Sequence, residues 1–173
     1  MKGFHDVASG LLPARLRKAA MVVLGCLASG AGAPVLADGG PFAGLTGTWR
    51  GTAQIRLQSG SSETLKCYAY YTPKASGAEL GLAIRCASAS NKIELRAQLA
   101  ATAGKVSGRW EERTYNATGD VTGQAQDGRL TLNIDGGAFK GSMAVRTTGA
   151  NQTVNITTQG IALSGVNINL SRG

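Results

Sequence analysis

The sequence predicts an all-β protein, an antiparallel up-and-down barrel of eight to ten strands, with a two-sheet β-sandwich as the alternative. Apolar and polar residues alternate over many short segments, which is the period of a strand with one buried and one solvated face. Turn signals separate these segments, and no long stretch has helical spacing. Closing the sheet would remove the exposed edges that promote aggregation.

The first strand is expected to begin at Gly47-Thr48-Trp49. From Trp49 to Leu57 every second residue is small or apolar, and the residues between them are polar. Nine further segments follow the same rule and are interpreted as strands. They are Glu63–Tyr71, Ala78–Ser88, Asn91–Ala100, Lys105–Thr114, Asp120–Gln126, Arg129–Asp135, Ala138–Thr147, Gln152–Thr158 and Ile161–Ser171.

The connections between these segments carry turn residues. Asp127-Gly128 between two alternating runs is typical of a two-residue hairpin. The other turn signals lie at 75–77, 90–91, 135–137 and 148–151. The apolar phase shifts between Leu163 and Val166, which predicts a bulge at Ser164-Gly165.

Several glycines occupy the inward phase of the predicted strands. They are Gly51, Gly108, Gly123 and Gly141. Glycine relieves crowding where a barrel strand bends sharply, and it also leaves space for a ligand. The sequence leaves both interpretations open.

The first 37 residues have the features of a secretory signal peptide. Arg15, Arg17 and Lys18 precede an apolar, uncharged stretch at 19–33, and small residues favour cleavage after Ala37. We therefore expect a periplasmic or secreted protein.

An alternative processing route lies inside this leader. Val23-Leu24-Gly25-Cys26 resembles a bacterial lipobox, in which Cys26 would be lipidated and the protein would be an outer-membrane lipoprotein. The expected organisation is a signal peptide at 1–37, a flexible N-terminal segment at 38–45 and a single barrel domain at 46–173.

Charge and residue content exclude several functions for the chain after cleavage. The leader holds four of the 18 Lys and Arg residues and one of the 10 Asp and Glu residues, so the net charge falls from +8 to +5. His5 is the single histidine, so its loss excludes Ser-His-Asp and Cys-His catalysis. We expect a protein that is not an enzyme and needs no cofactor.

The two cysteines of the barrel domain are expected to form one disulfide. Cys67 and Cys86 lie on the inward faces of two successive predicted strands, and export favours oxidation. Two cysteines without histidine provide too few ligands for a zinc site, so no metal is expected.

Inward-facing residues are the candidates for a ligand site. The apolar ones are Ile55, Leu57, Leu82, Ile84, Leu95, Trp110, Leu132, Phe139 and Val145. From these we select Trp110, Phe139, Leu82 and Leu132 as ligand-binding, and we add Tyr71 and Glu112. Glu112 shares the face of Trp110, so it either pairs with an arginine at the rim or contacts a ligand head group.

The outward residues include two tyrosines and many bases. Tyr68 and Tyr70 share the outer face with Arg50, Arg56, Lys66, Arg85, Arg96 and Arg109. This wall is either an ordinary solvated surface or a basic surface for anionic lipid, lipopolysaccharide or an acidic polymer. Nucleic acid is not an expected partner, because the bases alternate with acids and the chain is expected to be exported.

The motif Gly47-Thr48-Trp49 resembles the Gly-x-Trp signature of the lipocalins and their calycin relatives. In those barrels the Trp closes one end and an Arg of the last strand packs across it, so the resemblance implies this role for Trp49 and Arg172. The chain also resembles the bacterial Inh-type metalloprotease inhibitors, exported barrels whose N-terminal segment enters the protease cleft, and small uncharacterised envelope proteins of alphaproteobacteria.

The expected function is a non-enzymatic, lipocalin-like binding protein for an apolar or amphipathic envelope molecule such as a lipid. Two alternatives stay open. One is a module that binds an envelope protein, such as a protease inhibitor acting through residues 38–45. The other is a structural envelope protein, with membrane association through lipidation or the basic surface.

Overall fold

A computed structural model of the chain describes residues 39–173 as a ten-stranded closed sheet with two short 3-10 helices. The helices are η1 (Ala43–Leu45) and η2 (Ala75–Gly77). The strands are β1 (Gly47–Leu57), β2 (Ser62–Lys74), β3 (Glu79–Ala87), β4 (Lys92–Thr102), β5 (Lys105–Glu112), β6 (Ala117–Gln126), β7 (Arg129–Asp135), β8 (Lys140–Thr148), β9 (Asn151–Gln159) and β10 (Leu163–Arg172).

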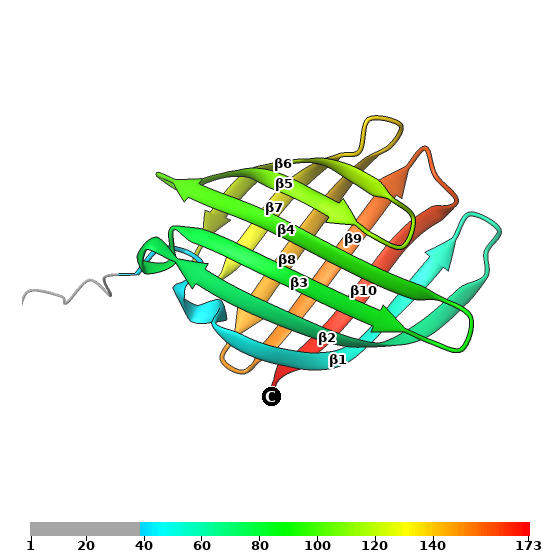
Figure 1. Ribbon diagram of the computed structural model, residues 1–173, viewed down its shortest axis with the longest axis horizontal. Helices are drawn as coiled ribbons and strands as arrows, with labels where there is room; N and C mark the ends of the chain where they lie inside the picture. The colour runs from blue at the N-terminus through cyan, green and yellow to red at the C-terminus, as the bar shows by residue number, and fades with distance from the viewer. Residues whose placement is uncertain (1–38) are drawn as a thin grey trace, which may run out of the picture. The chain divides into compact units, whose positions relative to one another are not determined.

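Each strand pairs antiparallel with the next along the chain, and β10 pairs with β1 (Figure 1). The expectation of an up-and-down barrel is confirmed at its upper limit of ten strands, and the sandwich alternative is wrong because the sheet has no break. The signal peptide expected at 1–37 and the alternative lipidation site at Cys26 lie outside the described residues.

The alternation of side chains determines the inner and outer surfaces. In β2, Leu65, Cys67 and Ala69 are buried, and the residues between them are exposed. Leu65 lies opposite Ala53 of β1, so inward residues face inward residues across the pair. A slip of one residue would move this whole apolar set into water, which is why the burial pattern specifies the register.

The turns confirm the sequence interpretation where glycine is required. Asp127 and Gly128 both have left-handed φ, of 49° and 72°, as a two-residue hairpin with the twist of the strands demands. Ser164 is the extra residue of the expected bulge, because Arg56 pairs with Gly165 whereas Leu57 pairs with Leu163. The expected inward position of Leu57 is wrong, since the pairing shifts at that point and its side chain is exposed.

The inward glycines allow neighbouring strands to approach each other closely. A Cβ on Gly51 would come within 1.9 Å of the carbonyl oxygen of Asn169, and one on Gly123 within 2.1 Å of that of Thr131. These oxygens belong to neighbouring strands, so any side chain would push the ladder apart. Relief of crowding is therefore the physical reason for glycine at these two positions.

One end of the barrel, here called the closed end, is sealed by η1 and the residues around it. Phe42 and Trp49 have no exposed surface, and Leu45 is buried beside them. The Trp49 indole Nε1 donates a hydrogen bond to the Leu45 carbonyl oxygen at 3.0 Å. The Arg172 guanidinium lies 4.5 Å from the centre of the Trp49 ring, as the lipocalin resemblance implies.

The same guanidinium also ties η1 to the last strand. Arg172 donates hydrogen bonds to the carbonyl oxygens of Thr46 and Gly44, on either side of Leu45. Residues 38–45 were expected to be a flexible segment. Within this segment Phe42 and Leu45 enter the core, and the Phe42 amide donates to the Gly77 carbonyl oxygen.

A buried polar chain lies next to this seal. The Tyr71 hydroxyl donates to Gln152 Oε1 at 2.6 Å, and Gln152 Nε2 donates to the Thr147 hydroxyl at 3.1 Å. Burial raises the pKa of Tyr71 well above its ordinary value, so the phenol stays a neutral donor. The polar groups carried into this end are therefore paired, as burial requires.

The expected disulfide is confirmed. Cys67 on β2 and Cys86 on β3 lie directly opposite each other and are bonded, both buried in the interior. The bond links the middle of β2 to the second-last residue of β3.

We expect Phe42→Ala to lower the free energy of unfolding by about 3–5 kcal/mol, because it removes a fully buried ring from the closed end. Urea denaturation would measure the change. The control is Tyr115→Ala, since Tyr115 is 65% exposed and its loss should change stability by less than about 0.5 kcal/mol. Equal behaviour of the two variants would contradict the packing of this segment.

Reduction of the Cys67–Cys86 disulfide is expected to lower the free energy of unfolding by about 2–4 kcal/mol, because the unfolded chain gains freedom when the link is broken. Denaturation with and without dithiothreitol would measure it. A Cys67→Ala, Cys86→Ala double variant is the control and should be insensitive to the reductant. An unchanged wild-type midpoint would argue against the bond.

Candidate functional site

The end of the barrel opposite η1, here called the open end, carries an aromatic pair. Trp110 faces inward near the end of β5, and Phe139 precedes β8. Their ring centres are 5.7 Å apart, with the planes inclined at 56°. Both side chains are half-buried, so the pair forms part of the interior and part of the surface.

Two glycines let these rings lie directly against the strands. A Cβ on Gly119 would come within 2.8 Å of Trp110 Nε1, and one on Gly136 within 2.3 Å of the Phe139 ring. Any larger residue at either position would displace an aromatic ring. The local sequence therefore leaves room for the two rings beside the backbone of β6 and of the loop that follows β7.

Trp110 Nε1 is a hydrogen-bond donor without an acceptor. It is the single buried side-chain nitrogen or oxygen atom within residues 39–173 that lacks a partner. A buried donor left unsatisfied costs about 1–3 kcal/mol, so such groups are rare and call for a physical explanation.

Other apolar side chains in the same half of the barrel are also only partly covered. We call this set the apolar mouth: Ile93, Leu95, Trp110, Phe139, Met143 and Leu163. Its members come from β4, β5, the loop before β8, β8 and β10, in the strand halves nearest the open end, which lies at the right of Figure 1. These inward-facing side chains keep part of their surface exposed.

Two carboxylates at this end hold the loops. Glu63 accepts hydrogen bonds from Ser88, Ser90 and Asn91, which join β2 to the loop between β3 and β4. Glu112 accepts from the backbone amides of Glu94 and Tyr115, each at 2.7 Å.

The hydrogen bonds lower the pKa of both carboxyl groups. For Glu63, the Ser88 hydroxyl is the largest cause, followed by Ser90 and Asn91. For Glu112, burial alone would raise the pKa, but the backbone and side-chain donors around it together outweigh that effect and lower it. The Glu112 carboxylate is therefore ionised, and its hydrogen bonds stabilise the turn between β5 and β6.

The structure brings together only some of the six residues expected at the ligand site. Trp110 and Phe139 are in contact, and Glu112 lies two residues further along β5. Leu132 is buried deeper, opposite Gly123 and Met143. The remaining two residues lie in the other half of the barrel: Tyr71 is part of the closed end, and Leu82 pairs with it.

Sequence reasoning left Met143 and Leu163 unassigned and did not place Ile93 among the lining residues. Met143 shares the phase of Val145, which was a candidate, so the alternation of β8 was a usable signal. Leu163 precedes the bulge, where alternation gives no guide to the inward face.

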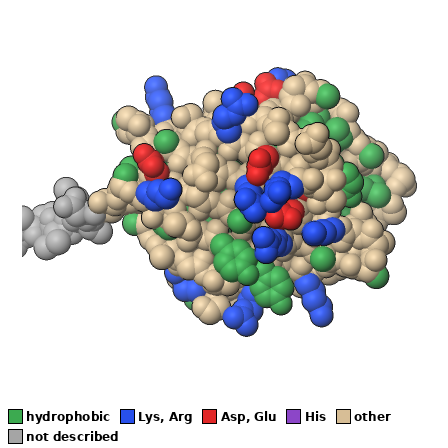
Figure 2. Space-filling view, viewed as in Figure 1, with side chains coloured by type: hydrophobic (Ala, Val, Ile, Leu, Met, Phe, Trp, Pro, Cys, Tyr) green, Lys and Arg blue, Asp and Glu red, His purple; other side chains and the backbone are tan. Residues whose placement is uncertain are grey.

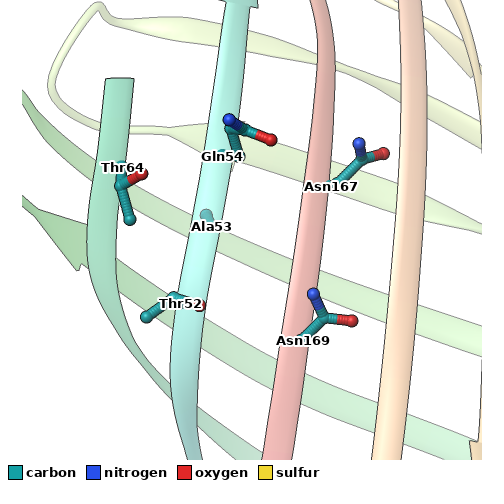
Figure 3. A pocket seen from close by; sticks show the side chains of 6 residues that line it. All are labelled: Thr52, Ala53, Gln54, Thr64, Asn167 and Asn169. Atoms are coloured by element: carbon teal, nitrogen blue, oxygen red, sulfur yellow. The ribbon is translucent and has the colours of Figure 1, made fainter. Parts of the chain in front are cut away.

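Two surface hollows lie elsewhere on the barrel. One is lined by Thr52, Ala53, Gln54, Thr64, Asn167 and Asn169 on the outer wall of β1, β2 and β10 (Figure 3). The other is lined by residues of β6, β7 and β8, including Asp120 and Lys140. Neither hollow includes a side chain of the apolar mouth.

Within residues 39–173, no three His, Cys, Asp or Glu side chains are grouped so as to hold a metal ion. None of the helices in this part of the chain combines the length and apolar character needed to cross a membrane.

Comparison with solved structures finds chains with a similar overall fold. Rv2717c from M. tuberculosis matches with a TM-score of 0.58 and 10% identity, over 75% of this chain and 93% of that chain. The S-type phycobiliprotein lyase CPES from Guillardia theta matches with a TM-score of 0.53 and 15% identity, over 76% of this chain and 90% of that chain. At these identities the likeness shows the fold alone.

No family model and no curated protein matches the chain. The resemblances to Inh-type inhibitors and to alphaproteobacterial envelope proteins receive no support from these comparisons.

Replacing Glu112 by Gln should destabilise the protein at pH 7 by about 1 kcal/mol, because the ionised carboxylate accepts backbone hydrogen bonds in a partly exposed position. The folded pKa lies below the unfolded value of about 4.5, so this stabilisation exists above that pH and disappears as the pH falls through the folded pKa.

The measurement is chemical denaturation of wild type and variant at pH 7 and at pH 3. The control is Glu111→Gln, which removes the same charge from the exposed outer face. A difference between wild type and Glu112→Gln that is as large at pH 3 as at pH 7 would contradict the role of the ionised carboxylate.

Proposed function

We propose that this protein binds an amphipathic molecule of the cell envelope at the apolar mouth, without catalysing a reaction. One observation carries the proposal: the buried indole N–H of Trp110 has no acceptor and lies among half-covered apolar side chains, at the end that η1 does not close. A polar group beside an apolar surface is the usual composition of a small-molecule site.

The chemistry of the mouth selects the kind of ligand. The side chains of Ile93, Leu95 and Met143 offer contacts to an acyl chain or a ring, at about 0.8 kcal/mol for each methylene removed from water. Trp110 offers one donor, which suits an ester, amide or carboxyl oxygen. We expect a ligand to place its apolar end among these side chains and to leave the rest outside the barrel.

We further propose that the protein acts after export, in the periplasm or outside the cell. The disulfide supports this compartment, because such bonds persist where the surroundings are oxidising. The leader expected at 1–37 agrees with it, and lipidation at Cys26 would place the same barrel on a membrane.

The alternative role as a protease inhibitor needs residues 38–45 to extend from the barrel. Phe42 and Leu45 are instead part of the core, so moving them would open the closed end. This cost favours the binding role.

The test uses a brominated fatty acid, 9,10-dibromostearic acid, because bromine quenches tryptophan emission only at contact. The chain has two tryptophans, Trp49 at the closed end and Trp110 at the mouth. We expect saturable quenching of the wild type, and loss of nearly all of it in Trp110→Phe, which retains Trp49 as the internal reference.

Calorimetric titration of both proteins with the same acid separates loss of the reporter from loss of binding. Leu95→Asn, at the mouth, should weaken binding at least tenfold, while Leu57→Asn, an exposed leucine outside the mouth, should not. Absence of saturable quenching in the wild type, or equal quenching in Trp110→Phe, would overturn the proposal.

A further inference from the structure

A second surface, on the outside of the barrel, gathers bases around two exposed tyrosines. Figure 2 shows Lys and Arg side chains clustered beside exposed hydrophobic side chains on the wall formed by the first strands. We call the outward residues of this wall the basic-tyrosine face: Arg50, Lys66, Tyr68, Tyr70, Arg85 and Arg96. Tyr68 and Tyr70 keep 49% and 44% of their surface exposed.

Strand register brings these side chains together. Tyr68 of β2 lies opposite Arg50 of β1 and Arg85 of β3, so the three residues share one row of the outer face. Tyr70 follows on the same face of β2, two residues further along. The face is therefore one continuous area across four neighbouring strands.

Glu94 organises three arginines at the edge of this face. Its carboxylate lies 3.6 Å from Arg85, 3.6 Å from Arg96 and 3.5 Å from Arg113. The Glu94 side chain is 17% exposed, while the three arginines are 45–59% exposed. One carboxylate shared by three guanidinium groups leaves positive charge that an anionic partner would neutralise.

The hollow of Figure 3 adjoins the same face. Its hydroxyl and amide side chains come from Thr52, Gln54, Thr64, Asn167 and Asn169, and its volume is about 340 Å³. Thr52 lies directly opposite Lys66 and two residues from Arg50. Hydroxyl and amide groups donate and accept hydrogen bonds, which matches them to sugar hydroxyls.

We propose that the basic-tyrosine face and this hollow together bind an acidic polysaccharide. The guanidinium groups pair with its carboxylates, the tyrosine rings lie against sugar faces, and the hollow binds the uncharged hydroxyls. A flat membrane fits less well, because the barrel wall is convex and the tyrosines lie among bases. An acidic peptide would leave the amides and hydroxyls of the hollow without matching hydroxyl groups.

This inference stands apart from the proposed function. Tyr68 and Tyr70 alternate with Ala69 and Tyr71, which face inward, so the two surfaces occupy opposite sides of the sheet. A failure of fatty acid binding at the mouth would leave the outer face untouched, and the reverse is equally true.

The experiment measures binding of polygalacturonate, a carboxylated glycan, by calorimetry at low and moderate salt. We expect wild-type binding that weakens with salt. The Arg85→Gln, Arg96→Gln variant should bind at least tenfold more weakly, and Tyr68→Ala and Gln54→Ala should each weaken binding severalfold.

The matched control is Arg129→Gln, Arg146→Gln. These two outward arginines pair across β7 and β8 on another part of the wall, so their loss changes net charge equally. The control should bind within twofold of wild type, and neutral dextran should bind far more weakly than polygalacturonate.

Four results would overturn the proposal. They are no binding of polygalacturonate, equal weakening by the two double variants, equally tight binding of poly-glutamate, and binding of phosphatidylglycerol vesicles in place of the glycan. The first two would exclude a specific site, and the last two would assign the face to an acidic protein segment or a membrane.

Discussion

The stacking of Arg172 on Trp49 is the contact on which the closed end of this barrel depends. It joins residues that face each other on the neighbouring strands β10 and β1, and the same guanidinium binds two carbonyl oxygens beside η1. Without the Arg172 side chain, the carbonyl oxygens of Thr46 and Gly44 would lose their hydrogen-bond donor. The face of the Trp49 ring that Arg172 covers would also be exposed. With one end sealed in this way, access to the interior is left to the opposite end, where the side chains are only half-covered.

The alternation of side chains along each strand separates the inner surface of the barrel from the outer surface. Successive residues face opposite sides, so β2 places Tyr68 and Tyr70 outside and Ala69 and Tyr71 inside. Changes on one side leave the contacts of the other largely intact, and distant sites of this sort usually contribute independently to stability. A small barrel can therefore carry an apolar opening and a charged polar wall without conflict between them.

Local patterns allowed much of this structure to be predicted, and tertiary geometry explains the rest. Alternation located the strands, and the adjacency of Cys67 and Cys86 followed from pairing successive strands. The separation of Tyr71 from Phe139 did not follow, because it depends on which layer of the barrel each residue occupies. The burial of Phe42 could not be predicted from the sequence either, because the segment around it is short and glycine-rich and has no periodicity.

The connectivity of the sheet has a kinetic consequence. Nine of its ten pairings join strands that follow one another in the chain, so each closes a short loop. The tenth, between β1 and β10, brings together regions as far apart as Thr46 and Arg172, which are 126 positions distant. Long loops close at the greatest entropic cost, so this seam is expected to form last. Until β1 and β10 pair, the chain is an open sheet with two unpaired edges. The rate at which these two strands pair therefore sets how long the edges are exposed to other chains.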